Sequence, residues 1–251
     1  GLFRLNYDYD KKYFITSSYR LDGASQFGKN QKWGFFPSVS IAYRIDKEDF
    51  FKDNVTFLTN LKLRTGYGTA GNDNIPSFRT QGLIDFTPVH VGGGVQPGIA
   101  TVGTYKPNPD LHWEESKTFN VALEFGNKYF YAEIDVYNKK TEELLLNRNL
   151  PTETGFQSTT VNKGVMENKG IEGKVNFYFR SSDNKLRWTP GVWFSSNKNK
   201  ILDFDNDILN YDGGNWIQNV NYGNTGIRQE GYSANAQWGH DFIGIWQSNE
   251  A

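Results

Sequence analysis

Two neighbouring carboxylates are the first candidates for chemistry in this sequence. Glu114 and Glu115 are adjacent, so on a strand their side chains would point to opposite faces. A glycosidase needs two carboxylates that face each other across the scissile bond. This pair does not meet that requirement, which weighs against an all-β glycoside hydrolase, and we predict no catalytic residue.

A second acidic group has the spacing of a calcium loop. Asp203, Asp205 and Asp207 occupy alternate positions, as do the first ligands of an EF-hand. The glycine at position six and the glutamate at position twelve of such a loop are replaced by Ile208 and Gly214. We therefore predict a solvated acidic loop with no metal and no cofactor, and leave Ca²⁺ binding open as the alternative.

The segment DGASQFGKN at 22–30 is rich in glycine and ends near a lysine. It lacks the GxxxxGK[ST] spacing with which a P-loop holds phosphate. The segment is predicted to be a loop turn. Arg20 and Asp22 just before it are predicted to pair at the end of a strand.

Aromatic side chains in the predicted loops are candidates for ligand contact, because their faces stack on flat, partly apolar surfaces such as sugar rings. The alternative is that they hold long loops to one another. We predict ligand binding for four of them, all in long connections outside the predicted strands: Tyr105, Tyr211, Trp216 and Tyr222.

The composition is polar on average but rich in aromatic residues. The 251 residues carry a net charge of −1, contain no cysteine and are 16% aromatic, and the mean hydropathy is −0.65. This charge gives no global attraction to nucleic acid, and disulfides and thiolate metal sites are excluded. No apolar run approaches the roughly 20 residues of a membrane helix. The chain begins directly on a strand pattern, which suggests a piece of a longer protein.

A period of two dominates the hydrophobic pattern, as expected of strands with one apolar and one polar face. In WGFFPSVSIAYRI at 33–45 the odd positions are apolar, and only Phe36 breaks the alternation. The pattern predicts eight strands, at residues 2–9, 13–22, 33–45, 61–68, 119–125, 130–136, 171–179 and 186–195.

Three tight turns predict the register of neighbouring strands. Only residues of the same face can stand opposite each other across a hairpin. The loop lengths predict pairing of Tyr9 with Tyr13, of Gly126 with Tyr129, and of Arg180 with Lys185.

The connections between the strands alternate in length. Short turns follow the first, fifth and seventh strands, and a moderate link follows the third. Long connections occupy 23–32, 70–116 and 141–168. Membrane barrels have short turns on the periplasmic side and long loops outside. Aromatic residues also gather at the ends of the apolar faces, as interfacial girdles do. These features favour a transmembrane barrel over a soluble sandwich.

Five sequence blocks resemble SusC/RagA-type TonB-dependent outer-membrane transporters, in the order and spacing of that family. The block NPDLHWEE is widely shared among TonB-dependent receptors, which makes its Trp113 a wall residue rather than a ligand contact. The blocks are RLNYDYDKKYFITSSYRLDGASQFGKNQKWGFFPSVSIAYRI, LKLRTGYGTAGNDNI, NPDLHWEESKTFNVALEFG, DVYNKKTEELLL and LPTETGFQSTTVNKGVMENKGIEGKV.

The resemblance implies an all-β fold in which residues 1–251 are part of one barrel of about 22 strands. About eight or nine strands are present, whereas the plug domain, the TonB box and the final strands are expected outside the chain. The family further implies location in the outer membrane of a Gram-negative bacterium and uptake of an oligosaccharide or a peptide. Its partners would be the TonB complex, a SusD-like lipoprotein lid and the lipid bilayer, with no nucleic acid. A siderophore or cobalamin receptor and a carbohydrate-binding sandwich or adhesin module remain the alternatives.

Overall fold

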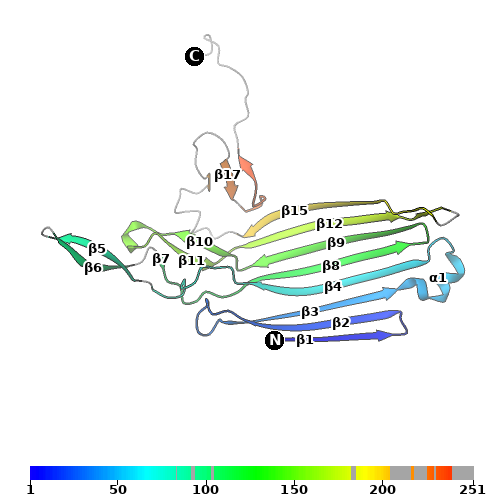
Figure 1. The fold of residues 1–251 in the computed structure, drawn as a ribbon, viewed down its shortest axis with the longest axis horizontal. Helices are drawn as coiled ribbons and strands as arrows, with labels where there is room; N and C mark the ends of the chain where they lie inside the picture. The colour runs from blue at the N-terminus through cyan, green and yellow to red at the C-terminus, as the bar shows by residue number, and fades with distance from the viewer. Residues whose placement is uncertain are drawn as a thin grey trace, which may run out of the picture.

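The computed structural model describes residues 1–82, 84–91, 94–102, 105–181, 185–203, 216–217, 225–228 and 230–238. Its main element is an antiparallel sheet of eight strands in the order β1-β2-β3-β4-β8-β9-β12-β15 (Figure 1). These strands are β1 (Leu2–Tyr9), β2 (Tyr13–Gly23), β3 (Trp33–Arg44), β4 (Asn60–Asn72), β8 (Glu114–Gly126), β9 (Phe130–Glu142), β12 (Val165–Phe177) and β15 (Gly191–Asp203).

Smaller elements lie at the two ends of this sheet. Among the described residues no helix is long and apolar enough to cross a membrane. The elements are η1 (Ile45–Lys47), α1 (Asp49–Asn54), β5 (Ile84–Val91), β6 (Gly94–Val102), β7 (Tyr105–Lys106), β10 (Leu145–Asn149), η2 (Thr152–Thr154), β11 (Ser158–Asn162), β13 (Phe179–Arg180), β14 (Arg187–Trp188), β16 (Trp216–Ile217), β17 (Thr225–Arg228) and β18 (Gln237–Trp238).

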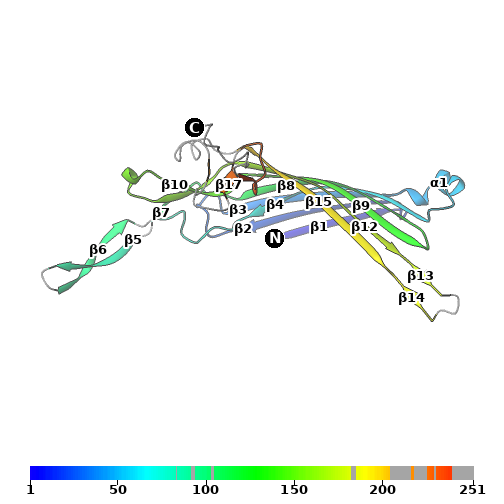
Figure 2. The ribbon, with the colours of Figure 1, turned by 90° about the horizontal axis from the view of Figure 1, so that it is seen from above.

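The eight-stranded sheet is a single curved layer (Figure 2). Side chains at the middle of its apolar face are open to the surroundings: Val39 is 42% exposed, Leu63 38% and Val121 36%. In a sandwich these positions would be buried against a second sheet. The structure therefore confirms the eight predicted strands and decides against the sandwich.

Several strands are longer than the pattern predicted. β4 continues to Asn72, and β12 already begins at Val165 rather than at position 171. The predicted seventh strand is divided into β12 and β13, and the predicted eighth strand into β14 and β15. β15 continues to Asp203. Hydrogen bonding to a neighbouring strand continues beyond the part of each strand in which side chains alternate, so the pattern underestimates strand length.

The alternation of short and long connections is confirmed. At the α1 end of the sheet (Figure 1), β1 and β2 are joined at 10–12, and β8 and β9 at 127–129. At the other end, the connections between β2 and β3, between β4 and β8 and between β9 and β12 are long.

One of the three predicted registers is confirmed and one is corrected at Asn127. Tyr9 pairs with Tyr13 as predicted, but Gly126 pairs with Tyr131 rather than with Tyr129. The Asn127 side chain explains the difference, because its Oδ1 accepts hydrogen bonds from the backbone N–H of Tyr129 at 2.8 Å and of Phe130 at 3.2 Å. Such an Asx turn places the asparagine before the two central turn residues.

The third predicted register is wrong by the same step. Arg180 pairs with Arg187 rather than with Lys185, and Phe179 pairs with Trp188. The rings of Phe179 and Trp188 stack with centroids 5.3 Å apart, a contact that favours the observed pairing. In both hairpins the shift is two residues, so every side chain keeps its predicted face.

The best-buried apolar cluster lies among the long loops. Leu111 is 0% exposed and Phe27 2%, with Trp113 packed against them. The backbones of two loops approach closely here, since a Cβ at Gly28 would lie 2.0 Å from the Pro109 carbonyl oxygen. The long loops are therefore packed against one another at this end of the sheet.

Candidate functional site

The polar face of the sheet carries a row of four charged side chains contributed by four neighbouring strands. The register places Lys62 opposite Glu124, Glu124 opposite Glu133, and Glu133 opposite Lys174. Adjacent glutamates on paired strands repel each other, so Glu124 and Glu133 need cations around them.

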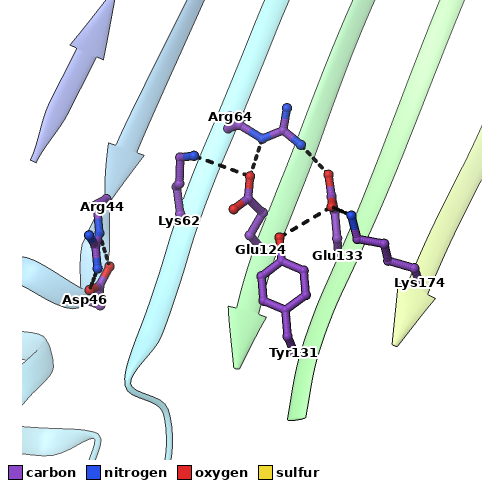
Figure 3. Close-up of polar contacts among 8 residues, drawn as sticks. All are labelled: Arg44, Asp46, Lys62, Arg64, Glu124, Tyr131, Glu133 and Lys174. Carbon is purple, nitrogen blue, oxygen red and sulfur yellow. Dashed lines mark hydrogen bonds and ion pairs between the residues drawn. The ribbon is translucent and has the colours of Figure 1, made fainter. Parts of the chain in front are cut away.

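Arg64 bridges the two glutamates (Figure 3). Its Nε lies 2.5 Å from Glu124 Oε1, and its Nη2 donates a hydrogen bond to Glu133 Oε1. Room for the guanidinium comes from the small side chain of Ala122, which stands opposite Arg64. One cation thus neutralises the contact between two carboxylates.

Lysines complete the row at both ends. Lys62 Nζ lies 3.5 Å from Glu124 Oε1, and Lys174 Nζ lies 2.7 Å from Glu133 Oε2. The Tyr131 hydroxyl donates a hydrogen bond of 3.4 Å to the same oxygen of Glu133. The lysine side chains remain 28% and 49% exposed, so the network suits a wet surface rather than a dry core.

Further polar pairs lie on this face. Arg20 Nε is 2.6 Å from Asp22 Oδ2, which confirms the predicted pair, and Asn120 Nδ2 donates to Asp135 Oδ2 at 3.1 Å. No group of three or more His, Cys, Asp or Glu side chains that could hold a metal is found in the described part of the chain. The face is suited to contact water and hydrophilic solutes.

The opposite face carries a stripe of exposed apolar side chains that is oblique to the strand pairing. One row of paired residues joins Ile41 in β3 to Val121, Val136, Ile171 and Ser196 in later strands. In β3 the apolar side chains continue beyond this row toward the long loops, as far as Trp33. In β15 they end at Phe194, on the short-turn side of the row.

The other border of the stripe shifts in the same direction. In the first strands it ends at Tyr9, Tyr13 and Tyr43, whereas in the last hairpin it continues to Phe179 and Trp188. Strands of a membrane barrel are tilted by about 35–45°. Because the strands are tilted, the rows of paired residues are inclined to the membrane plane. A hydrocarbon layer parallel to that plane would therefore contact residues farther toward the long loops in β3 than in β15, and the apolar stripe is displaced in this way.

Tyrosines mark the short-turn border of the stripe. The rings of Tyr13 and Tyr43 stack with centroids 5.0 Å apart and planes at 2°, and Tyr9 lies 6.4 Å from Tyr13. Ring stacks of this kind are typical of the interface between hydrocarbon and water. Their position agrees with the predicted girdle, because tyrosine is enriched where hydrocarbon meets water.

Only one of the predicted ligand-binding aromatics has a described side chain. Tyr105 lies in β7 beside Ser158 of β11 and is 44% exposed. The Arg79 guanidinium covers one face of its ring at 3.3 Å. Trp216 lies in β16, while Tyr211 and Tyr222 lie outside the described residues.

The candidate calcium loop is only partly within the described structure. Asp203 is the last residue of β15. Asp205 and Asp207 lie outside the described residues, so the alternative of Ca²⁺ binding stays a prediction.

The surroundings of Phe36 explain why this apolar residue stands at a polar-face position of the alternating pattern. It is 5% exposed on the otherwise polar face, and its ring meets the Trp113 ring edge to face. Gly34 and Gly71 leave the space that the two rings occupy. Trp113 thus supports the barrel wall, as predicted, and this aromatic cluster is a structural feature that the alternating pattern did not reveal.

Comparison with known proteins agrees with this geometry. A family model for the β-barrel of TonB-dependent receptor-like proteins matches residues 2–249. TonB-dependent receptor P26 of Formosa agariphila is 39% identical over 254 residues, covering 98% of this chain and 24% of that protein. TonB-dependent receptor SusC of Bacteroides thetaiotaomicron is 36% identical over 183 residues, covering 69% of this chain and 18% of that protein.

A solved structure of the RagAB peptide importer in its closed-closed state superimposes with a TM-score of 0.77 at 29% identity, covering 92% of this chain and 24% of that one. The chain spans about a quarter of the length of the P26 receptor, with 24% of that protein covered. The family match covers nearly the whole chain, and the sheet has one apolar and one charged face. The chain belongs to the β-barrel domain of TonB-dependent receptors and is of the SusC/RagA type.

Proposed function

We propose that the chain is a stretch of the barrel wall of an outer-membrane transporter that imports a large hydrophilic nutrient with energy from the TonB complex. The main support is that one face of the sheet is apolar and the other face is charged. Apolar side chains such as Val121 face outward, and the ion pairs around Arg64 face a wet bore. The plug, the TonB box and the final strands would lie outside this chain.

A SusD-like lipoprotein would cover the long-loop end of the barrel. The relationship to SusC supports this partner. The packed loops supply a firm base for such a lid, since Leu111 and Phe27 are buried between them. Phe78 and Tyr105 remain more than two-fifths exposed at this end and are available for contact with a lid or a cargo.

An oligosaccharide is the proposed cargo. Tyr105 is 44% exposed, and the ring face opposite Arg79 would stack on a sugar ring. The transporter would release its cargo unchanged, so the protein would not be an enzyme.

A peptide is the second candidate, and two observations favour it. The superimposed RagAB structure is described as a peptide importer. The bore face also presents both signs of charge, in the row from Lys62 to Lys174, and could contact the charged groups of a peptide. A siderophore or cobalamin is less favoured, because the relatives described above are of the SusC and RagA type.

Growth of a deletion strain tests the cargo class. The strain lacking the gene should fail to grow on one glycan of a panel supplied as sole carbon source, and should grow normally on the corresponding monosaccharide. Complementation by the complete gene should restore growth, whereas a copy lacking the TonB box should not. Unchanged growth on every glycan together with lost growth on oligopeptides would contradict the glycan as cargo and support the peptide.

A further inference from the structure

Five lysines gather on the outward face of the sheet, directly beyond the apolar stripe on the long-loop side. Lys117 stands two positions from Phe119, and Lys169 two positions from Ile171. Strands rise about 3.3 Å per residue, so these amino groups lie within roughly one headgroup layer of the hydrocarbon border. The lysines come from four adjacent strands: Lys117 of β8, Lys140 of β9, Lys169 of β12, and Lys198 and Lys200 of β15.

The strand register brings these side chains together on one face. Lys117 is paired with Lys140, and Lys169 with Lys198. Lys200 stands opposite Glu167. Like charges on opposite positions of paired strands are destabilising, so the two lysine pairs need a compensating anion.

Carboxylates of the same face compensate only part of this charge. Glu142 contacts both Lys117 and Lys140, the latter at 2.7 Å, and Glu167 lies 3.0 Å from Lys169. In the part of the chain that the structure describes, neither Lys198 nor Lys200 has a carboxylate oxygen within 4.0 Å. Lys198 and Lys200 are exposed beside the apolar surface, and Glu167 is close enough to Lys200 for electrostatic attraction.

A groove connects these lysines with the apolar stripe. It has a volume of about 710 Å³ and is open to the surroundings. One part of its lining is apolar, with Phe119, Val136 and Ile171. The other part is charged and carries three lysines and one carboxylate: Lys169, Lys198, Lys200 and Glu167. A ligand that fits both parts has an anionic head and a hydrocarbon tail.

We propose that this outward groove binds the phosphorylated headgroup of an outer-leaflet lipid, with Lys198 and Lys200 as the principal phosphate contacts and the apolar lining as the acyl-chain surface. The occupant is lipid-borne phosphate rather than free phosphate, because the lysines adjoin the surface that faces hydrocarbon. The inference rests on the membrane placement in the proposed function and is independent of the cargo.

Lipid binding to the complete transporter tests the proposal. The purified protein in detergent is titrated with fluorescent diphosphoryl lipid A, with the same lipid lacking phosphates, and with diphosphoryl lipid A in the presence of excess inorganic phosphate. Each lysine near a headgroup contributes about 1 kcal/mol, which is about fivefold, to the affinity for an anionic lipid. The variant Lys198→Gln/Lys200→Gln should therefore bind diphosphoryl lipid A roughly thirtyfold more weakly.

The matched control removes the same charge from positions away from the groove. Lys11 is exposed in the turn between β1 and β2, and Lys128 is exposed in the turn between β8 and β9. The variant Lys11→Gln/Lys128→Gln should keep the wild-type affinity. Resistance of the barrel to unfolding in cold SDS verifies that both variants are folded, and cargo import should continue in both, which separates this proposal from the proposed function.

Three outcomes would overturn the proposal. The groove variant could bind diphosphoryl lipid A as tightly as the control variant does. The wild-type protein could bind the dephosphorylated lipid equally well. Inorganic phosphate at millimolar concentration could displace the lipid completely, which would make the site one for a free anion.

Discussion

The ring of Trp113, from the long connection after β4, stands edge-on against the ring of Phe36 in β3, with centroids 5.4 Å apart and planes at 73°. The indole Nε1 also donates a hydrogen bond of 3.3 Å to the carbonyl of Lys32. This contact attaches a long loop to the wall at the position where the alternating pattern of residues 33–45 has its one exception. Edge-to-face pairs of this kind stabilise beyond the area that they bury.

Phe36→Ala should destabilise the complete protein by about 3 kcal/mol, because the side chain is buried and leaves a cavity beside Trp113. Urea unfolding in detergent micelles measures the change in the free energy of unfolding. Phe50→Ala is the matched control, since Phe50 in α1 is 61% exposed and should change stability by less than about 0.5 kcal/mol. Equal effects of the two substitutions would show that the Phe36–Trp113 contact does not support the wall.

Gly71→Ala should cost about 1–3 kcal/mol of stability, because a Cβ at this position would lie 2.0 Å from Phe36 Cζ and the packed rings would have to move. At Gly82 the nearest atom is 3.9 Å from such a Cβ, so Gly82→Ala should leave stability nearly unchanged. The same urea series measures both variants. A neutral Gly71→Ala would contradict the packing of the two rings described above.

The Arg64–Glu133 pair should show a coupling energy of about 1 kcal/mol in a double-mutant cycle with Arg64→Ala and Glu133→Ala. The side chains are 34% and 19% exposed, so solvent screens the pair only in part. The coupling should decrease when the salt concentration rises. The exposed pair of Lys52 and Asp49, at 52% and 91% exposure, should give no measurable coupling. A coupling near zero at low salt would show that Arg64 does not hold the two glutamates together.

The carboxylate of Glu48, in the link between η1 and α1, should make stability depend on pH. Burial acts to raise its pKa, but hydrogen bonds from Tyr43, Lys12 and Tyr13 outweigh burial and lower the pKa below the usual 4.5. A lowered pKa in the folded state means that the stabilisation is fully present above pH 4.5. It is lost as the pH falls through the lower pKa of the folded protein.

The stability difference between wild type and Glu48→Gln should therefore be constant above about pH 5 and shrink progressively below pH 4.5. Melting temperatures from pH 3 to pH 7 measure this difference. Glu153→Gln, an exchange at an exposed position in η2, controls for the loss of one carboxylate. A difference that grows as the pH falls would have the wrong sign and would refute the assignment.

Tyr105→Ala should weaken binding of the proposed cargo roughly three- to tenfold, as expected for one aromatic stacking contact. Isothermal titration of the complete transporter with the glycan identified in the growth test measures the affinity. Tyr232→Ala serves as the control, because Tyr232 has a similar exposure of 52% on a different segment. An unchanged affinity in Tyr105→Ala would show that Tyr105 does not contact the cargo and only packs against Arg79.

The sequence by itself determined the strands and their faces. Alternation in stretches such as residues 33–45 depends only on the geometry of a single strand, in which successive side chains point to opposite sides. The same pattern cannot distinguish registers that differ by two residues, because such a shift leaves every face unchanged. The turns at Asn127 and at Arg180 were therefore predicted with the correct faces and the wrong partners.

Only the tertiary structure decided which side chains from distant strands meet. The bridge from Arg64 to Glu124 and Glu133, the contact of Phe36 with Trp113 and the outward lysines of β8 to β15 all depend on strand order and register. A single strand carries no information about the strands that will pair with it, since that choice is made by the hydrogen bonds and side-chain contacts of the assembled sheet. The local pattern thus determined two surfaces, and pairing across strands decided the groups of residues that act together on each surface.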